Sequence, residues 1–207
     1  STSNVNSMKS MFYNCQSLKS LYLNYNNFDT YYVTDMSYMF YNCKQLITLK
    51  INNYYFRSNN LQTTNRMFYN CLTLDSLEFH SNFNLYSVRD MTGMFYHCHN
   101  LRYLNLEYFK TYNVQNMEGL FGECYKLTSI YINTNNFKTS TVTNMKKMFY
   151  KCNALTSINL NYNNFQTSKV TDMSYMFYGC SSLSQINFYY FNTINVENME
   201  YMLFNCT

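Results

Sequence analysis

The sequence predicts an α/β solenoid, in which short coils stack into one elongated domain. The motif Met-Phe-Tyr-Asn-Cys at 11–15 returns seven more times with small changes, and its cysteine is present in every copy. Successive cysteines are 26 to 28 residues apart, at Cys15, Cys43, Cys71, Cys98, Cys124, Cys152, Cys180 and Cys206. Units of this length cannot bury a core alone and must stack on their neighbours.

A first apolar pattern predicts one short helix per coil. Apolar side chains from Val33 to Cys43 recur at i, i+3, i+6, i+7 and i+10, which matches one face of a helix of about three turns. Thr34 or Asp35 is suited to cap its start. The same pattern begins at Val5, Val88, Val114, Val142, Val170 and Val196, with Leu61 in place of valine in the third copy.

A second pattern predicts one short parallel strand per coil. Leu18, Leu21 and Leu23 give Leu-x-x-Leu-x-Leu, whose last part alternates inward and outward as a strand does. The copies differ in length only between this strand and a following phenylalanine, so one corner varies while the core stays in register. We expect the core to consist of ladders of valine, methionine, phenylalanine, cysteine and aliphatic residues.

The repeat resembles a known family. The first copy matches the leucine-rich-repeat motif Leu-x-x-Leu-x-Leu-x-x-Asn-x-Leu at Leu18, Leu21, Leu23, Asn26 and Phe28, and the sixth copy has Asn163 at the asparagine position. With the string Val-Thr-Asp-Met-Ser-Tyr-Met-Phe-Tyr-Asn-Cys at 33–43, the chain resembles BspA-like leucine-rich-repeat surface proteins of the long Met-Phe-x-x-Cys variety. The resemblance implies a cell-surface or extracellular scaffold for adhesion or for binding host or matrix molecules.

We expect residues 1–207 to form a single repeat domain of about seven and a half coils. The helical pattern starts at Val5 and occurs again just before Cys206, which gives one more predicted helix than strands. Neither end carries a polar capping repeat, so we expect the sequence to be a segment of a longer array.

Composition argues against nucleic acid and membrane spans. The net charge is +4, charged residues make up 13% of the chain, and lysines and arginines are spread among acids instead of forming a stripe. No apolar run approaches the roughly 18 residues that a membrane span needs. Reduced cysteines would also suit a cytoplasmic scaffold, which stays open as an alternative location.

The cysteines and histidines are expected to be structural. Each cysteine occupies the same place in its coil, and parallel side chains about 5 Å apart hold their β-carbons too far apart for a disulfide, so we expect buried free thiols. His97, Cys98 and His99 form the only sequence cluster with metal-ligand chemistry. Because residues i and i+2 diverge at a helix end, we predict no metal site there.

No catalytic or cofactor-binding residues are expected. The chain has four glycines, no glycine-rich phosphate loop and no serine elbow. The fourteen methionines fall at core positions and are interpreted as filler. We therefore predict that this segment is not an enzyme.

Tyrosine and the outward strand positions supply the candidate surfaces. A candidate assembly column follows the core phenylalanine of most copies: Tyr13, Tyr41, Tyr69, Tyr96, Tyr150 and Tyr178. A candidate binding face lies on the strands: Tyr22, Lys50, Glu78, Asn105, Tyr131, Asn159 and Asn187. Tyrosine offers contact area with a polar tip, although the column could also serve only to cover the core edge.

Two function classes follow from these surfaces. The first is a structural or adhesive element of a cell surface or an extracellular filament. The alternative is a monomeric recognition module that binds a protein or glycan through the strand face or through the tyrosine-rich variable corner. That corner contains Tyr31, Tyr32, Tyr54, Tyr55, Tyr108, Tyr112, Tyr189 and Tyr190.

Overall fold

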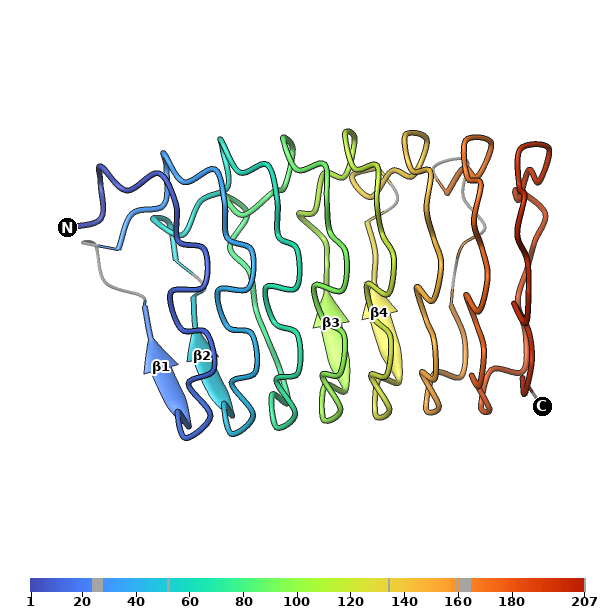
Figure 1. The fold of residues 1–207 in the computed structure, drawn as a ribbon, viewed down its shortest axis with the longest axis horizontal. Helices are drawn as coiled ribbons and strands as arrows, with labels where there is room; N and C mark the ends of the chain where they lie inside the picture. The colour runs from blue at the N-terminus through green and yellow to red at the C-terminus, as the bar shows by residue number, and fades with distance from the viewer. Residues whose placement is uncertain (24–27, 52, 134, 159, 161–164, 207) are drawn as a thin grey trace.

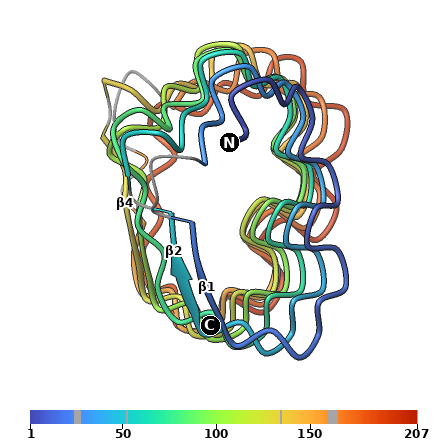
Figure 2. The same cartoon turned by 90° about the vertical axis from the view of Figure 1, so that its left-hand side faces the viewer.

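The chain folds as a row of stacked coils, numbered 1 to 8 by the cysteine that each contains. The computed structural model describes residues 1–23, 28–51, 53–133, 135–158, 160 and 165–206. Figure 1 shows the coils side by side along the long axis, with the N terminus at one end and the C terminus at the other. Figure 2 looks along the stack, where the coils superimpose as loops around a common interior. The predicted repeat solenoid is confirmed.

The turn segment, residues 33–43 in coil 2 and their equivalents, joins each coil to the next in the same way. In coil 2 the backbone N–H groups of Met36, Tyr38, Phe40 and Asn42 donate to carbonyl oxygens of coil 3 at 2.8–3.2 Å. Single parallel bridges extend this contact through the stack, with one residue from each coil: Ser7, Asp35, Thr63, Asp90, Asn116, Asn144, Asp172 and Asn198. Hydrogen bonding between coils is therefore continuous on this side.

The prediction of a helix per coil is wrong. The described residues contain no α-helix, and the turn segment is a succession of tight turns. The N–H groups of Met39, Tyr41 and Cys43 bond back to the carbonyl three residues earlier. Tyr38 and Asn42 have φ angles of 58° and 63°, a left-handed region that no α-helix contains. Successive turns of this length return side chains to the inner face at nearly helical spacing, so the apolar pattern does not distinguish the two.

Asp35 caps the start of this segment, but it closes a turn instead of a helix. Its Oδ1 accepts the backbone N–H of Ser37 at 2.7 Å. The equivalent side-chain oxygen accepts the N–H two residues later in every other coil: Ser7, Thr63, Asp90, Asn116, Asn144, Asp172 and Asn198. This arrangement is typical of aspartate, asparagine, serine and threonine at turns.

The strand segment, residues 46–51 in coil 2 and their equivalents, is less regular. β1 (Ser20–Tyr22) pairs in parallel with β2 (Thr48–Lys50), and β3 (Tyr103–Asn105) pairs in parallel with β4 (Ser129–Tyr131). A single bridge, Ser157 to Gln185, joins coils 6 and 7. Residues 72–80 of coil 3 form no strand, so the prediction of one strand per coil is wrong there; among the described residues, strands are present in coils 1, 2, 4 and 5. The break coincides with Phe79, whose ring occupies a position that is aliphatic in the neighbouring coils.

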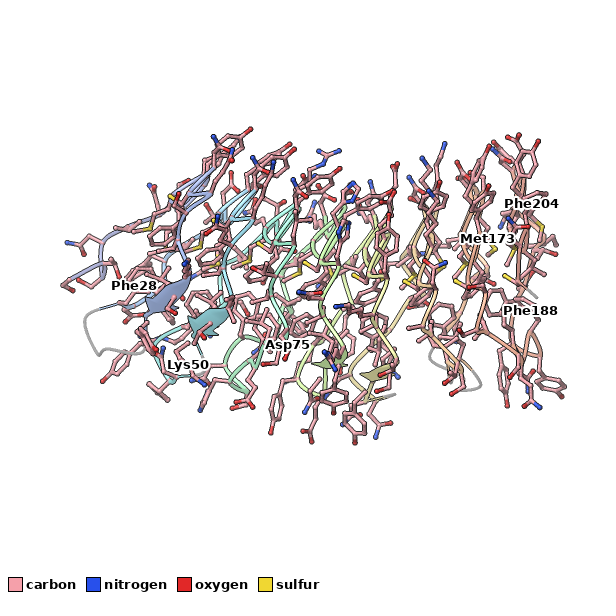
Figure 3. All side chains as sticks on the ribbon, turned by 90° about the horizontal axis from the view of Figure 1, so that it is seen from below. Phe28, Lys50, Asp75, Met173, Phe188 and Phe204 are labelled. Atoms are coloured by element: carbon pink, nitrogen blue, oxygen red, sulfur yellow. The ribbon has the colours of Figure 1, made fainter. Side chains whose placement is uncertain are left out.

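Stacked rings and sulfur atoms fill the interior. The predicted valine, methionine, phenylalanine and cysteine ladders are fully buried in the middle coils. One phenylalanine stack, with centroids 5.2–5.9 Å apart, runs through Phe12, Phe40, Phe68, Phe95, Phe121, Phe149 and Phe177. Figure 3 shows sulfur atoms distributed along the same interior, with Phe188 and Phe204 at the C-terminal end. The core is thus one continuous column.

In coils 1, 4 and 6 a buried threonine fixes the spacing between the corner phenylalanine (Phe109 in coil 4) and the next turn segment. Thr111 Oγ1 donates to the carbonyl of Lys138 at 2.6 Å and accepts the N–H of Lys138 at 2.8 Å. Thr30 and Thr167 make the same reciprocal pair with the next coil. An insertion here would leave these buried groups unpaired, which costs about 1–3 kcal/mol each.

The eight cysteines are free thiols, as predicted. From Cys43 onward, each Sγ lies 3.0–3.2 Å from the carbonyl oxygen of the core phenylalanine in the preceding coil and donates its S–H to it. Burial raises the pKa of Cys98 and Cys180 to about 12 and that of Cys43 to about 11. These thiols stay protonated at neutral pH, and cysteine serves here as a small apolar donor.

Candidate functional site

The predicted binding face is partly assembled by the strand register. Tyr22 of β1 lies beside Lys50 of β2, and Asn105 of β3 lies beside Tyr131 of β4. Tyr22 and Tyr131 expose 54% and 49% of their surface. Because coil 3 has no strand, exposed Glu78 stands outside both sheets, so the face consists of two separate parts.

Two asparagines of this face have a structural task. Asn105 Oδ1 accepts the N–H of Glu107 at 2.9 Å, and Asn187 Oδ1 accepts the N–H of Tyr189 at 2.8 Å. They close the shorter corners of coils 4 and 7, which lack the motif asparagine. Asn159, Asn26 and Asn163 lie outside the described residues.

Sequence reasoning missed a second outward row on the strands. Ser20, Thr48, Tyr103 and Ser129 point outward two residues before the predicted face and lie in register in pairs. Tyr103 is 48% exposed, and Ile47 beside this row is 52% exposed. The alternation of the strand pattern implied this row, because residues i and i+2 share a face.

The tyrosine column exists, but its rings mostly cover one another. Tyr13, Tyr41, Tyr69 and Tyr96 stack with centroids 4.9–5.4 Å apart, and Tyr150, Tyr178 and Phe204 form a second stack. All but Tyr13 and Phe204 are half-buried.

Gly122 interrupts the column between these two stacks. A β-carbon at Gly122 would lie 2.3 Å from the Tyr96 ring, so this ring fills the place of the missing side chain. The column therefore covers the core edge and presents ring edges, not faces, to solvent.

The variable corner of coils 1 and 2 carries a charged centre among tyrosines. Arg57 pairs with Asp29, and its guanidinium lies 4.8 Å from the centroid of Tyr31 and 5.5 Å from that of Tyr54. Desolvation raises the pKa of Asp29, but hydrogen bonds from Arg57 and from the Tyr31 N–H outweigh it and hold the pKa below its usual range. Tyr32 and Tyr54 remain more than half exposed. This corner combines aromatic surface with an ion pair at its centre.

The residues directly before the cysteines form a polar ladder whose chemistry changes along the stack. In coils 1 to 3 it is an amide chain: Asn42 donates to Asn14, and Asn70 Nδ2 donates to Asn42 Oδ1 at 2.6 Å. In coils 4 to 6 the same positions hold His97, Glu123 and Lys151. Side chains of opposite charge type therefore meet across neighbouring coils.

His97, His99 and Glu123 come together at this point. His97 Nδ1 lies 3.2 Å from His99 Nε2 and 3.0 Å from Glu123 Oε2. The expectation that His97 and His99 diverge is wrong, because His97 has a φ of 61° in a tight turn and not at a helix end. Cys98 between them points inward to the Phe68 carbonyl, as predicted.

Tyrosines and burial shape this cluster. Tyr125 Oη donates to Glu123 Oε2 at 2.6 Å, and its ring packs on His99 with centroids 4.5 Å apart. Burial lowers the pKa of both histidines against the opposing effect of Glu123; Lys151 lowers the pKa of His97 further, and His97 that of His99. Neutral imidazoles have free lone pairs, so this group has the chemistry of a metal-ligand set.

Two shallow hollows lie on the surface of the turn segments. One of about 200 Å³ is lined by Arg66, Tyr69, Thr92, Gly93, Tyr96, Glu118, Gly119 and Lys147. The other, of about 340 Å³, is lined by Lys151, Asn153, Tyr178, Gly179, Ser181 and Asn205. Both occur where glycine replaces a larger side chain of the repeat. In the part of the chain that the structure describes, no helix has the length and apolar character to cross a bilayer.

A family model described as "Mycoplasma protein of unknown function, DUF285" matches residues 1–99, 65–158 and 128–207. The chain belongs to the DUF285 family. The overlapping matches reflect the repeat, because the model spans several coils and fits at more than one register. No curated protein sequence matches the DUF285 chain.

Solved leucine-rich-repeat proteins are similar to this DUF285 chain. A leucine-rich-repeat protein of T. pallidum is 18% identical, with a TM-score of 0.55 over 86% of this chain and 71% of that one. A leucine-rich cell surface protein of Faecalibacterium prausnitzii is 22% identical, with a TM-score of 0.49 over 82% of this chain. A leucine-rich-repeat protein of Eubacterium ventriosum is 14% identical, with a TM-score of 0.45 over 91% of this chain.

The match to the T. pallidum protein confirms the leucine-rich-repeat fold. The DUF285 chain spans 38% of the Faecalibacterium protein and 59% of the Eubacterium protein. The predicted resemblance to BspA-like leucine-rich-repeat proteins is confirmed at the level of the repeat family. The assignment to the long Met-Phe-x-x-Cys variety stays a prediction.

Proposed function

We propose that the chain is a non-enzymatic repeat module of a cell-surface or extracellular protein, with a structural or adhesive role. The observation that carries the proposal is the contrast between a continuously bonded turn side and a strand side whose outward residues, exposed tyrosines among them, vary from coil to coil. A stack whose coils are all joined in register is stiff. A stiff stack with an outward aromatic surface suits a protein that extends from a cell surface and adheres to a partner.

The adhesive surface is assigned to the strand face and the adjoining corner. Tyr22, Tyr103 and Tyr131 offer rigid contact area, and hydroxyl and amide groups beside them offer hydrogen bonds. Exposed charged residues, including Lys50, Glu78 and Arg102, lie among these groups. A protein or glycan surface of similar polarity fits this chemistry.

Self-assembly into a filament is part of the same proposal. The candidate assembly column exposes ring edges and hydroxyl groups along Tyr13, Tyr41, Tyr69 and Tyr96, which supports lateral contacts between stacks more than insertion into a partner. The expectation that residues 1–207 belong to a longer array stays a prediction.

The alternative is a monomeric recognition module that binds one protein or glycan. The specific support is the strand register, which sets Tyr22 beside Lys50 and Asn105 beside Tyr131 and so makes a different surface in each half. A surface that varies from coil to coil favours recognition of a defined ligand. A cytoplasmic scaffold would use the same face, and free thiols suit that compartment.

Adhesion under flow tests the proposal. Beads coated with the purified chain are passed over surfaces coated with matrix protein, mucin glycan or albumin, and retention is counted. A triple variant of the strand face, Tyr22→Ser, Tyr103→Ser and Tyr131→Ser, should lose at least about 10-fold retention on the binding surface. The matched control replaces two similarly exposed tyrosines of the turn segments by serine, Tyr13 and Tyr201, which lie outside the strand face and the corner.

Electron microscopy of the same protein separates the two roles. Fibres, or lateral arrays of stacks, support the structural role, whereas isolated rods with strand-face binding support the recognition module. Equal retention of wild type and both variants on every surface, with no assembly in micrographs, would overturn both.

A further inference from the structure

The polar ladder before the cysteines contains a cluster that its repeat role does not require. In coils 1, 2, 3 and 8 this position is asparagine, and in the first three it forms an amide chain. Coils 4 and 5 replace the amides by His97 and Glu123, and coil 4 adds His99 two residues later. If this position only had to keep the turn in contact with solvent, the asparagine found in the other coils would be sufficient. Two imidazoles facing a carboxylate have a different chemistry.

We propose that His97, His99 and Glu123 bind a divalent transition-metal ion of the Zn²⁺ class and thereby clamp coil 4 to coil 5. The ligand atoms are His97 Nδ1, His99 Nε2 and an oxygen of Glu123. The site is independent of the proposed adhesive surface, because it lies in the turn segments and not on the strands.

The spacing of the ligand atoms fits such an ion. A tetrahedral zinc site with bonds of about 2.0–2.1 Å places neighbouring ligand atoms roughly 3.3 Å apart. The separations from His97 Nδ1 are 3.2 Å to His99 Nε2 and 3.0 Å to Glu123 Oε2. All three ligand atoms lie within 4.8 Å of one another. A small movement of the carboxylate completes three corners, and water can take the fourth.

The backbone holds the ligands in place before any ion arrives. The N–H of His97 donates to the Gly122 carbonyl at 2.9 Å, and the N–H of Glu123 donates to Tyr150 at 2.6 Å. Both residues are left-handed, with φ of 61° and 57°. His97 of coil 4 and Glu123 of coil 5 therefore lie side by side at equivalent positions. His99, the third ligand, belongs to the same turn as His97.

The surroundings support a cation of modest size. Side chains of His97 and Glu123 are 28% and 14% exposed, so an ion can enter and still be partly desolvated. The Tyr125 hydroxyl orients Glu123, as partners behind metal ligands commonly do. Two neutral imidazoles and one carboxylate suit zinc, and copper and nickel bind the same donor set. Lys151 in coil 6 works against the site and limits its affinity.

The cysteines do not compete for the ion. The Cys98 thiol is fully buried and donates to the Phe68 carbonyl at 3.2 Å. Zinc binding through thiolate would require this side chain to leave the core. The ligand set is therefore nitrogen and oxygen only.

The repeat itself supplies variants that keep the fold. His97→Asn introduces the residue found at the same left-handed position in coils 1 to 3, and His99→Gln introduces the residue of coil 1 at that place, Gln16. Glu123→Gln removes the carboxylate. His80→Gln is the matched control, because His80 is the third histidine and lies outside the cluster.

The experiment is calorimetric titration of ZnCl₂ into the full chain, purified without a histidine tag and freed of metal by a chelator. We expect one zinc per chain for wild type and His80→Gln, and at least about 10-fold weaker binding for the three cluster variants. Co²⁺ absorption provides the second readout, with a tetrahedral spectrum that lacks a thiolate charge-transfer band. The thermal unfolding temperature of wild type should rise with zinc, while His99→Gln should not respond.

Three results would overturn the proposal. The first is no saturable zinc binding by folded wild-type chain. The second is an equal loss of affinity in His80→Gln and His99→Gln. The third is a thiolate band in the cobalt spectrum, which would assign the ion to cysteine.

Discussion

Turn segments and strand segments belong to the same coils, yet they bond their neighbours very differently. The turn segments bridge coil to coil from Ser7 to Asn198 without a break, and each carries the same capping oxygen. Within the described residues, the strand segments form two separate pairs and a single bridge, with no strand in coil 3. Both are short and repeat with one period. Repetition of sequence therefore does not by itself give equal stability along the coil.

The difference follows from where the invariant side chains lie. Phenylalanine, methionine and cysteine of the turn segments stack on their own copies, whereas the strand segments alternate one buried residue with variable outward ones. Evenly stacked aromatic rings and S–H donors fix the spacing of the coils. The outward residues of the strand side can therefore vary from coil to coil. These outward residues form the proposed binding surface.

The largest expected effect comes from breaking the phenylalanine stack. Phe95 is fully buried between Phe68 and Phe121, with centroids 5.6 Å and 5.9 Å away. Phe95→Ala should lower the free energy of unfolding by about 3–5 kcal/mol, measured by urea titration. Tyr103→Ala on the strand segment of the same coil should change it by less than about 0.5 kcal/mol. Equal losses in the two variants would remove the distinction between the two sides.

A smaller loss is expected from the buried threonine that bonds coil 4 to coil 5. Thr111→Val keeps the shape but removes the buried hydroxyl that bonds both the N–H and the carbonyl of Lys138, so stability should fall by about 1–3 kcal/mol. The matched control is Thr128→Val, because Thr128 Oγ1 donates to Arg102 in an exposed place. No loss in Thr111→Val relative to this control would mean that water satisfies the buried groups.

Alkaline pH should loosen the stack through its thiols. Burial raises the pKa of Cys98 to about 12, while a thiol in the unfolded chain titrates near 8.5. The unfolded state therefore loses the proton first, so the stabilising effect is complete below about pH 8.5 and is lost as pH rises towards 12. Each such thiol lowers stability by up to about 1.4 kcal/mol per pH unit in this window.

Urea unfolding from pH 8 to 11 with fresh reductant measures this slope. Cys98→Ala should show a shallower fall than wild type. Identical slopes in the two proteins would contradict the buried S–H donor. Tyrosines and lysines also titrate in this range, and they are common to both proteins.

The smallest effect on stability is expected on the strand face. Tyr131→Ser removes an exposed ring from β4 and should change the unfolding free energy by less than about 0.5 kcal/mol while reducing adhesion. Circular dichroism melts and bead retention on the same samples check the two parts. A variant that melts early would show that this face supports the fold and is not free for binding.

The repeat, the core ladders and the free cysteines could be predicted from the sequence, because the buried residues recur at the same position of each coil. The sequence was insufficient for the helix, since tight turns and helical turns give the same inward spacing. A signal was present nonetheless. Asparagine or glycine stands directly before the cysteine in five copies, and these residues tolerate the left-handed backbone found there: Asn14, Asn42, Asn70, Gly179 and Asn205.

The metal-ligand cluster was missed for a related reason. His97 and His99 were compared with each other along one predicted helix, whereas Glu123 is 26 residues away in the sequence. Aligning the copies on cysteine sets His97 and Glu123 at one position of adjacent coils, where side chains are neighbours. In a solenoid, side-chain contacts are predicted more reliably by comparing equivalent positions of adjacent coils than by comparing residues close together in the sequence.

Native-state amide hydrogen exchange tests the contrast between the two sides most directly. In coil 4 the N–H groups of Gly93, Phe95 and His97 bond coil 5 at 2.8–3.0 Å, and Leu106 is the matching strand-side donor at 2.9 Å. We predict that the turn-segment amides exchange only with unfolding of the stack, and that amides in 103–106 exchange faster through local opening. Equal protection on both sides, or faster exchange in the turn segment, would contradict this account.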